Sequence, residues 1–347
     1  MSASTNLPAT LPRNCTFDAD DWLKLARHWY PVALSRDITS APTAATLLDA
    51  PLVIYRAGGE VVVANDICPH RGVPLSMGRA DGDGIACVYH GLRFGQSGRC
   101  AKIPAQPETA PIPAKLHLAT YPAIEQYGLI WTCLLPDGKT SIPNMPHWND
   151  AGFRQFVLPS FDIFAFAGRQ IEGFLDLAHY GFVHSTTFGD PNNVIVEPYV
   201  PVPNDVGFEV EYYSTLGNFP EGLRHLEPPG HRWLRHFHVH LPFTGTINIH
   251  YPGVERLVIM NAASPVSARH TRLFSPITRN FDTDVSEQDV TDYNFRVFNE
   301  DKAIVEAQRP ENLPLDLTLE AHIAADRSSI AYRRALREMG LSQFFTA

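Results

Sequence analysis

The sequence predicts an α+β protein in which a small all-β domain precedes a larger domain with helices flanking a twisted, mostly antiparallel sheet. Three observations lead to this fold class. Residues 45–135 consist of short β-rich runs separated by turn signals. Residues 136–160 contain four prolines, which is typical of a domain boundary. Residues 194–280 return to β patterns, and residues 286–340 have helical periodicity.

The individual elements follow from the same patterns. Gly58 and Gly59 separate two apolar runs and predict a β-hairpin. Residues 232–250 alternate in polarity, with Trp233, Arg235, Phe237, Val239 and Leu241 on one side. The predicted helices cover residues 18–30, 170–184, 287–305 and 317–339, and predicted strands include 52–56, 61–64, 85–89 and 129–135. We expect an N-terminal helical segment at residues 1–40, the β domain at 41–140 and the larger domain at 141–347.

Composition limits the function classes. Of the 347 residues, 44% are hydrophobic and 19% charged, which is typical of a globular protein with a full core. The net charge of -9 argues against a nucleic-acid-binding protein. No apolar run approaches the roughly 20 residues of a membrane span, and residues 1–14 lack the pattern of a signal peptide. Five cysteines are an odd set and no disulfide framework, so we expect a cytoplasmic protein.

Two cysteine–histidine pairs form the first candidate metal site. Cys68 and His70 form C-x-H, and Cys87 and His90 form C-x2-H sixteen residues later; each pair follows a predicted strand. Such a set can bind a structural zinc ion, or a Rieske [2Fe–2S] cluster, in which two histidines replace two cysteines on one iron. Zinc fingers take like ligands from each loop, whereas each loop here supplies one of each kind. The spacing therefore favours the Rieske cluster, with zinc as the alternative. The remaining cysteines are interpreted as ordinary thiols: Cys15, Cys100 and Cys133.

A second candidate site lies in the predicted helix at residues 170–184, where Asp176, His179 and His184 form D-x2-H-x4-H. On an ideal helix Asp176 lies about 60° from one histidine and about 80° from the other, so all three side chains can face one hollow. Two imidazoles and a carboxylate form the facial triad of non-haem Fe(II) oxygenases. For an isolated pair of histidines, hydrogen bonding in the core is the favoured interpretation; beside a Rieske cluster, iron binding is favoured.

These motifs resemble a known family. The segments CPHRG at 68–72 and CVYHGLRF at 87–94 look like the Rieske domain of bacterial ring-hydroxylating and demethylating oxygenases. Leu92 stands where that family usually has Trp, which changes a packing residue and not a ligand. The plan of the chain and the tail segments AQRP and ADRSSIAYRR look most like the monooxygenase branch, which includes vanillate O-demethylase, toluenesulfonate methyl-monooxygenase and methylxanthine N-demethylases. The resemblance implies a helix-grip arrangement in the larger domain.

The resemblance also implies roles for the residues of the second site. His179 and His184 are implied as ligands of a mononuclear Fe(II). Asp176 is implied as a hydrogen-bonded link between this site and His90 of a neighbouring subunit, not as a ligand. Gly173 stands where the family commonly has Asn, which alters the surroundings of the iron and removes no ligand.

The third ligand is implied to come from the C-terminal region. Residues 298–310 resemble the family's C-terminal helix, whose E-D-K motif contains an iron-binding Asp, and this role corresponds to Asp301. The rival carboxylates are Glu300, Asp292 and Glu306. Without the resemblance, a solvated helix face explains these acids equally well.

The implied function is that of a terminal oxygenase component with one [2Fe–2S] cluster and one mononuclear Fe(II) per chain. Electrons come from NAD(P)H through a ferredoxin-type reductase, and O2 oxidises a methyl group of a small aromatic or heteroaromatic substrate. A homotrimer is implied, because in the family electrons cross between subunits. Three alternatives remain: ring hydroxylation or dihydroxylation at the same iron, a Rieske electron carrier without oxygenase activity, and a zinc-stabilised binding protein.

Charged residues suggest where partners bind. Basic residues exceed acidic ones by three in residues 71–102, which favours docking of an acidic ferredoxin-like protein, with an ordinary solvated loop as the alternative. The basic residues are Arg71, Arg79, Arg93, Arg99 and Lys102. We expect residues 200–260 and the helix before Asp301 to form the substrate pocket. The basic side chains that could bind a carboxylate or sulfonate of the substrate are Arg235, His236, His238 and His250. Because side chains alternate along a strand, only about half of them can face the pocket.

Overall fold

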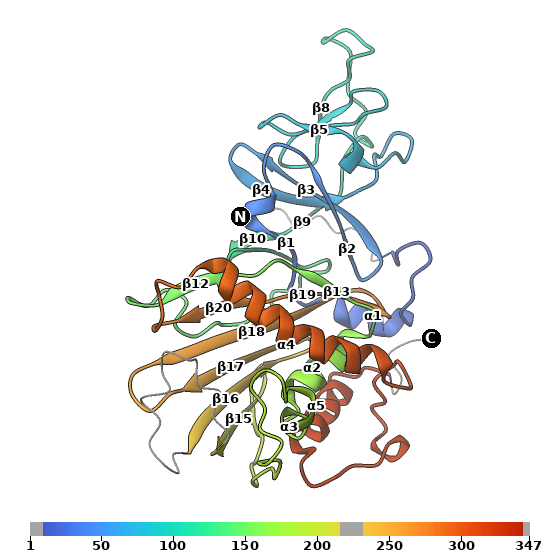
Figure 1. The fold of residues 1–347 in the computed structure, drawn as a ribbon. Helices are drawn as coiled ribbons and strands as arrows, with labels where there is room; N and C mark the ends of the chain where they lie inside the picture. Colours follow the sequence, from blue (N-terminus) through green and yellow to red (C-terminus); the bar gives the residue numbers. More distant parts are fainter. Residues whose placement is uncertain (1–9, 216–231, 343–347) are drawn as a thin grey trace. The chain divides into compact units, whose positions relative to one another are not determined.

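The computed structural model of the chain describes residues 10–215 and 232–342 (Figure 1). Its internal contacts divide the chain into two compact units, Met1–Ile142 and Pro143–Ala347. Among the described residues, no helix combines the length and the apolar character that a membrane crossing needs. Part of the expected pocket region, residues 216–231, lies outside the described residues.

The first unit contains three small β-sheets, as predicted for an all-β domain. Their strand orders are β2-β3-β4-β9, β5-β6-β7-β8 and β1-β11-β10. The strands are β1 (Tyr30–Leu34), β2 (Thr43–Leu47), β3 (Ala50–Ala57), β4 (Glu60–Asn65), β5 (Arg79–Ala80), β6 (Ile85–Ala86), β7 (Arg93–Phe94), β8 (Cys100–Lys102), β9 (Thr120–Tyr121), β10 (Ala123–Gln126) and β11 (Leu129–Thr132). The short 3-10 helices are η1 (Ser35–Asp37) and η2 (Leu75–Met77).

The predicted hairpin joins β3 to β4. Ala57 pairs with Glu60 across the turn, and Gly58 and Gly59 have φ angles of 61° and 86°. A two-residue turn that matches the twist of its strands needs positive φ at both central residues, which glycine adopts without strain. The local sequence therefore determines this turn.

The N-terminal helix is shorter than predicted. α1 covers Ala19–Leu25, and the Asp18 carboxylate caps it by accepting the Asp20 N–H at 2.9 Å. The chain then enters β1, in which every residue is buried and which pairs with β11. The prediction of helix up to residue 30 was wrong, because pairing with a distant strand outweighs local helical periodicity.

The second unit contains one nine-stranded antiparallel sheet, which confirms the fold class. The order is β12-β20-β18-β17-β16-β15-β14, with β19 paired to both β18 and β13. The strands are β12 (Arg154–Val157), β13 (Phe161–Ile163), β14 (Val202–Asn204), β15 (Gly207–Ser214), β16 (Trp233–His240), β17 (Thr244–His250), β18 (Arg256–Ser267), β19 (His270–Phe274) and β20 (Pro276–Arg279). The helices are α2 (Ala167–Leu175), α3 (Tyr180–Val183), η4 (Leu317–Leu319), α4 (Glu287–Ala307) and α5 (Arg327–Glu338). Figure 1 shows α4 running across one face of this sheet.

The polarity pattern of β16 correctly predicted its two faces. Trp233, Arg235, Phe237 and Val239 are buried, and the residues between them are half-buried. Alternate side chains of a strand point to opposite faces, so this strand has an interior side and a more exposed side.

The predicted helix at residues 170–184 is in fact two helices. α2 ends at Leu175, where Asp176 adopts an extended conformation (φ -75°, ψ 131°), and its Oδ1 accepts the Ala178 N–H at 2.8 Å. An Asp side chain that bonds nearby backbone N–H groups competes with the helix. The angular argument that assumed a continuous helix was therefore wrong.

The helix predicted at 317–339 is also interrupted, since only η4 and α5 are helical there. The helix predicted at 287–305 is confirmed by α4.

Four charged side chains connect the helices of this unit. Glu172 of α2 bonds Arg333 of α5 at 2.6 Å and Arg169 at 3.2 Å. Glu320 bonds Arg333 and Arg169, each at 2.6 Å. Glu172 and both arginines are less than a tenth exposed. Two acids and two bases thus balance each other in the interior and hold α2 at the position from which the chain continues to Asp176.

Removal of one member of this network is expected to destabilise the protein strongly. Arg333→Met leaves Glu172 buried without its shortest ion pair, which typically costs about 3–5 kcal/mol. Arg334→Met is the matched control, because Arg334 is the exposed neighbour on the same helix and its loss is expected to cost under about 0.5 kcal/mol. The measurement is the free energy of unfolding in urea. Equal stabilities of the two variants would contradict the structural role of the network.

Candidate metal centres and active site

Two loops of equal backbone geometry bring the first set of ligands together. In one loop the Cys68 N–H bonds the Val73 carbonyl and the Gly72 N–H bonds the Cys68 carbonyl, each at 2.9 Å. Cys87, Gly91 and Leu92 repeat the same two bonds, also at 2.9 Å. Gly72 and Gly91 have φ angles of 75° and 67°, so each tight loop depends on a residue without a Cβ. Cys87 directly follows β6, and Cys68 lies three positions after Asn65, the last residue of β4. Each loop therefore comes just after a strand, as predicted.

The side chains of these loops fit a two-iron cluster. Burial raises the pKa of the Cys68 thiol, and the adjacent Cys87 thiol raises it further, against backbone N–H groups that lower it. A buried thiol pair of this kind needs positive charge to ionise. The His70 and His90 rings lie 4.7 Å apart between centroids. His70 Nδ1 is buried and has no hydrogen-bond partner among the described residues, which suits a nitrogen that binds a metal.

Residues around the loops support this geometry. The Asp66 carboxylate accepts the Ser76 N–H at 2.7 Å and the Ser76 hydroxyl at 2.5 Å, which ties the end of β4 to η2. Leu92 is 3% exposed and belongs to the hydrophobic core beneath the loops, together with Phe94. The replacement of Trp at this position therefore concerns packing, as the sequence indicated.

The second set of ligands meets in the second unit although the helix is broken. His184 Nε2 lies 3.1 Å from His179 Nε2 and 3.0 Å from Asp301 Oδ1, and His179 Nε2 lies 3.4 Å from the same Asp301 oxygen. Metal–ligand bonds of about 2.0–2.1 Å at right angles place neighbouring ligand atoms about 2.9 Å apart. The three atoms therefore form nearly the triangle that one face of an octahedral ion requires.

A carboxylate lies beside the Nδ1 atom of each histidine, the ring nitrogen that does not belong to the triangle of ligand atoms. Asp176 Oδ2 lies 3.4 Å from His179 Nδ1, and Glu300 Oε2 lies 2.8 Å from His184 Nδ1. Thr186 and Thr187 also donate hydrogen bonds to Glu300, at 2.6 and 2.8 Å. Such partners fix the tautomer that presents Nε2 to a metal. Glu300, considered above as a rival ligand, instead contacts Nδ1 of His184. No sequence pattern indicated its two threonine partners.

The charges of this site affect its proton content. Burial opposes protonation of His179, but hydrogen bonds to Asp176 and Asp301 outweigh it and raise the pKa of His179 to about 9. Burial raises the pKa of Asp301, but its bonds to His179 and His184 lower it overall. A metal ion at this site therefore competes with a proton on His179 at neutral pH, and its affinity increases as the pH rises toward 9.

The other candidate acids lie elsewhere. Asp292 is exposed and accepts a hydrogen bond from Gln288 at 2.7 Å. Glu306 accepts the Phe164 N–H at 2.7 Å and pairs with Lys302. Neither contributes to the group formed by His179, His184 and Asp301.

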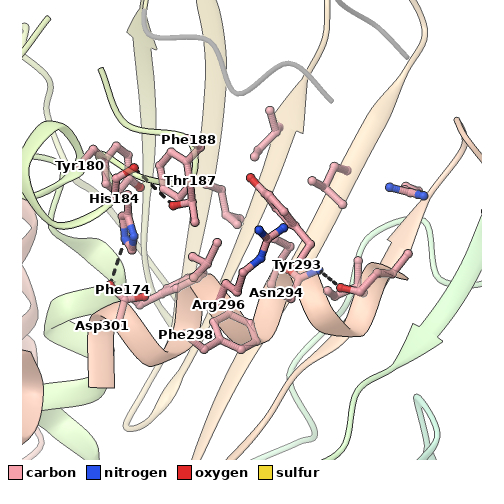
Figure 2. Close-up of a pocket in the computed structure, with 18 of the residues that line it drawn as sticks. Phe174, Tyr180, His184, Thr187, Phe188, Tyr293, Asn294, Arg296, Phe298 and Asp301 are labelled. Atoms are coloured by element: carbon pink, nitrogen blue, oxygen red, sulfur yellow. Dashed lines mark hydrogen bonds and ion pairs between the residues drawn. The ribbon is translucent and has the colours of Figure 1, made fainter. Parts of the chain in front are cut away.

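A cavity of about 480 Å³ opens beside the three ligands. Figure 2 shows His184 and Asp301 at one end and the side chains of α4 along the wall. The wall formed by the sheet includes the aliphatic side chains of Ile247, Ile249, Leu257, Ile259 and Ile277. Aromatic side chains also line the cavity, among them Phe174, Tyr180, Phe188, Tyr251, Tyr293 and Phe298. Charged side chains contribute as well, including Arg279, Arg296, Asp282 and Asp289. This size and lining suit a small aromatic molecule.

Of the four basic side chains considered for anion binding, the structure places one in the cavity wall. Arg235 lines the cavity, is 1% exposed and donates a hydrogen bond to the Ser214 hydroxyl at 3.0 Å. His236, His238 and His250 do not belong to the cavity wall. His236 and His238 alternate with Arg235 along β16 and so point to the opposite face of the sheet. Gly173 does line the cavity, so the small residue at this position adds space near the ligands.

Comparisons with known proteins identify the kind of domain in each part of the chain. Residues 28–122 match the Rieske [2Fe-2S] domain, and residues 165–342 match the vanillate O-demethylase oxygenase C-terminal domain. The methylxanthine N1-demethylase NdmA of Pseudomonas putida is 32% identical over 331 residues, which cover 92% of this chain and 91% of that protein. The oxygenase component of dicamba O-demethylase from Stenotrophomonas maltophilia is 33% identical over 164 residues, 45% of this chain and 46% of that one. The structure of NdmA with caffeine aligns with a TM-score of 0.83 at 30% identity, covering 92% of both chains.

Proposed function

Because this chain belongs to the Rieske non-haem iron oxygenases with a catalytic domain of the vanillate O-demethylase type, we propose that it is a terminal monooxygenase component that oxidises a methyl group of a small aromatic or heteroaromatic substrate. N-demethylation, O-demethylation and methyl hydroxylation are the reactions included. The observation that carries this proposal is the meeting of His179, His184 and Asp301 at one end of a cavity of about 480 Å³.

We assign the metal ligands accordingly. Cys68, Cys87, His70 and His90 hold one [2Fe–2S] cluster within residues 41–140, and His179, His184 and Asp301 hold one Fe(II) within residues 141–347. When bound, these groups supply one-electron transfer and O2 activation at iron. In the N-terminal segment at residues 1–40, we assign no ligand to the described residues 10–40.

The chain's own residues prepare this chemistry. His179, His184 and Asp301 would hold the ion at one end of the cavity, where a substrate and O2 could reach it. Glu300 and Asp176 hold the Nδ1 atoms of His184 and His179, so that Nε2 of each ring is directed at the ion's position. On His179 the ion would replace the proton that the metal-free site favours. The aliphatic and aromatic walls exclude water from the substrate methyl group and align the ring against the ligands.

Surface features support the proposed partners. His90 is exposed, and its ring contacts the tilted ring of Tyr89 with 3.8 Å between centroids. Val88, Tyr89 and Met77 are 58, 61 and 64% exposed. Apolar side chains around an electron-carrying histidine suit a protein interface. Asp176, 34% exposed, is accessible on the catalytic unit. We propose a homotrimer in which His90 of one subunit approaches Asp176 of the next.

Some of the basic residues in the segment 71–102 are available to bind a reductase, and others already pair with acids. Arg93 pairs with Asp81 at 2.5 Å and Asp83 at 3.4 Å, and Lys102 lies 3.8 Å from Glu108. Arg71, Arg79 and Arg99 are exposed and carry the remaining positive charge. We propose that an acidic, NAD(P)H-dependent ferredoxin-type reductase docks there, in the cytoplasm, where the thiols that hold no cluster, Cys15, Cys100 and Cys133, stay reduced.

Iron and sulfide analysis tests the proposal directly. Protein purified without oxygen is expected to contain three irons and two sulfides per chain. With a surrogate reductase and a panel of methoxy-, methyl- and N-methylaromatics, it is expected to consume O2 and release formaldehyde or a hydroxymethyl product. Two irons per chain would indicate an electron carrier instead, and a diol product would indicate ring dihydroxylation.

A further inference from the structure

A polar cluster lies on the face of the large sheet that is turned away from the cavity. Arg235 of β16 lines the cavity, so His236 and His238 lie on the other face. Glu209 of β15 is the register partner of His238. Directly opposed residues of antiparallel strands share a face, so this carboxylate and both imidazoles lie together.

One carboxylate oxygen of the cluster serves both histidines. Glu209 Oε2 lies 3.2 Å from His236 Nε2 and 3.6 Å from His238 Nδ1, and the two rings lie 4.0 Å apart between centroids. One ligand atom from each residue lies within 4.8 Å of the other two. Bonds of about 2.0–2.2 Å in tetrahedral geometry place ligand atoms about 3.3–3.5 Å apart. The cluster therefore lies close to the dimensions of a chelating site.

A buried amide next to the cluster is an independent observation. Asn248 of β17 is the register partner of His236 and shares its face. It is 6% exposed, and its Oδ1 is buried without a hydrogen-bond partner among residues 10–215 and 232–342. A buried amide oxygen without a partner is unfavourable. A cation beside His236, or a water molecule bound to that cation, supplies the missing partner.

We propose that Glu209, His236 and His238 bind one divalent transition-metal ion per chain, of the zinc type, at a site separate from the two iron centres. Imidazole and carboxylate ligands together suit zinc. The Glu209 and His238 side chains are 39 and 36% exposed, so the ion has access from solvent and keeps positions for water. Metal binding links β15 to β16. Because Arg235, on the opposite face of β16, belongs to the cavity wall, binding of the ion also stabilises the folded state of that wall by mass action.

Zinc binding to the iron-loaded protein tests this proposal. Holoenzyme is washed with a chelator that leaves its iron in place, then dialysed against Zn²⁺, and zinc and iron are counted. We expect one zinc per chain with no loss of iron, and a zinc-dependent rise in the melting temperature. His238→Gln and Glu209→Gln are each expected to weaken zinc binding by about ten-fold or more, with iron content and the visible spectrum unchanged.

His117→Gln is the matched control, because it removes a surface imidazole of the first unit that bonds the Ser97 carbonyl at 3.0 Å. This variant is expected to bind zinc as the parent does. The proposal is wrong if the parent takes no zinc, if zinc enters only as iron leaves, or if His238→Gln and Glu209→Gln bind zinc as tightly as the control.

Discussion

Asp301→Ala is expected to lose the mononuclear iron while the Rieske cluster stays in place. Asp301 Oδ1 is the only carboxylate oxygen within 3.4 Å of both His179 Nε2 and His184 Nε2 among the described residues. Without it, two imidazoles remain, and iron affinity and turnover should each fall by about 100-fold or more. Metal analysis should show two irons and two sulfides per chain, with the visible spectrum of the cluster unchanged.

Asp292→Ala provides the control for this prediction. Asp292 lies on the same helix but is exposed and bonds only Gln288 in the described contacts. Its removal should leave three irons per chain and normal turnover. If Asp301→Ala retained all three irons, the third ligand would have to be another acid.

Asp176→Asn is expected to retain both metal centres and yet lose turnover by about 100-fold or more. The amide oxygen of Asn can still accept the Ala178 N–H that Asp176 Oδ1 accepts at 2.8 Å, so the break between α2 and α3 should persist. The second oxygen, 3.4 Å from His179 Nδ1, is replaced by an NH2 group that cannot accept a hydrogen bond from this ring. The tautomer of His179 and the proposed link to the cluster of a neighbouring subunit both depend on that oxygen.

Two measurements distinguish this role from a structural one. Metal content should equal that of the parent protein, and the reduced cluster should be reoxidised slowly by O2 in the presence of substrate. Asp190→Asn is a matched control, because Asp190 also accepts a backbone N–H two residues on, from Asn192 at 2.9 Å, but contacts no metal ligand. Normal turnover of Asp176→Asn would exclude the coupling role.

Local patterns predicted the parts of the fold that depend on local chemistry. The turn at Gly58 and Gly59, the alternation of β16 and the long helix α4 all follow from residue type and spacing. Two of the three errors in the predicted helices arose where another contact competes with the helix. At β1 this is pairing with a distant strand, and at Asp176 it is the side chain's bond to the Ala178 N–H.

The sequence by itself determined which atoms can bind metal. The C-x-H and C-x2-H loops and the D-x2-H-x4-H segment carry thiolates, imidazoles and a carboxylate whose chemistry does not depend on the fold. Apart from the family resemblance, which implied Asp301, only the tertiary structure decided which acid of α4 completes the second set and which supports it. Asp301 and Glu300 are adjacent in sequence, but successive residues of a helix point about 100° apart. Packing of α4 across the sheet therefore turns Asp301 toward both Nε2 atoms and Glu300 toward the opposite nitrogen of His184.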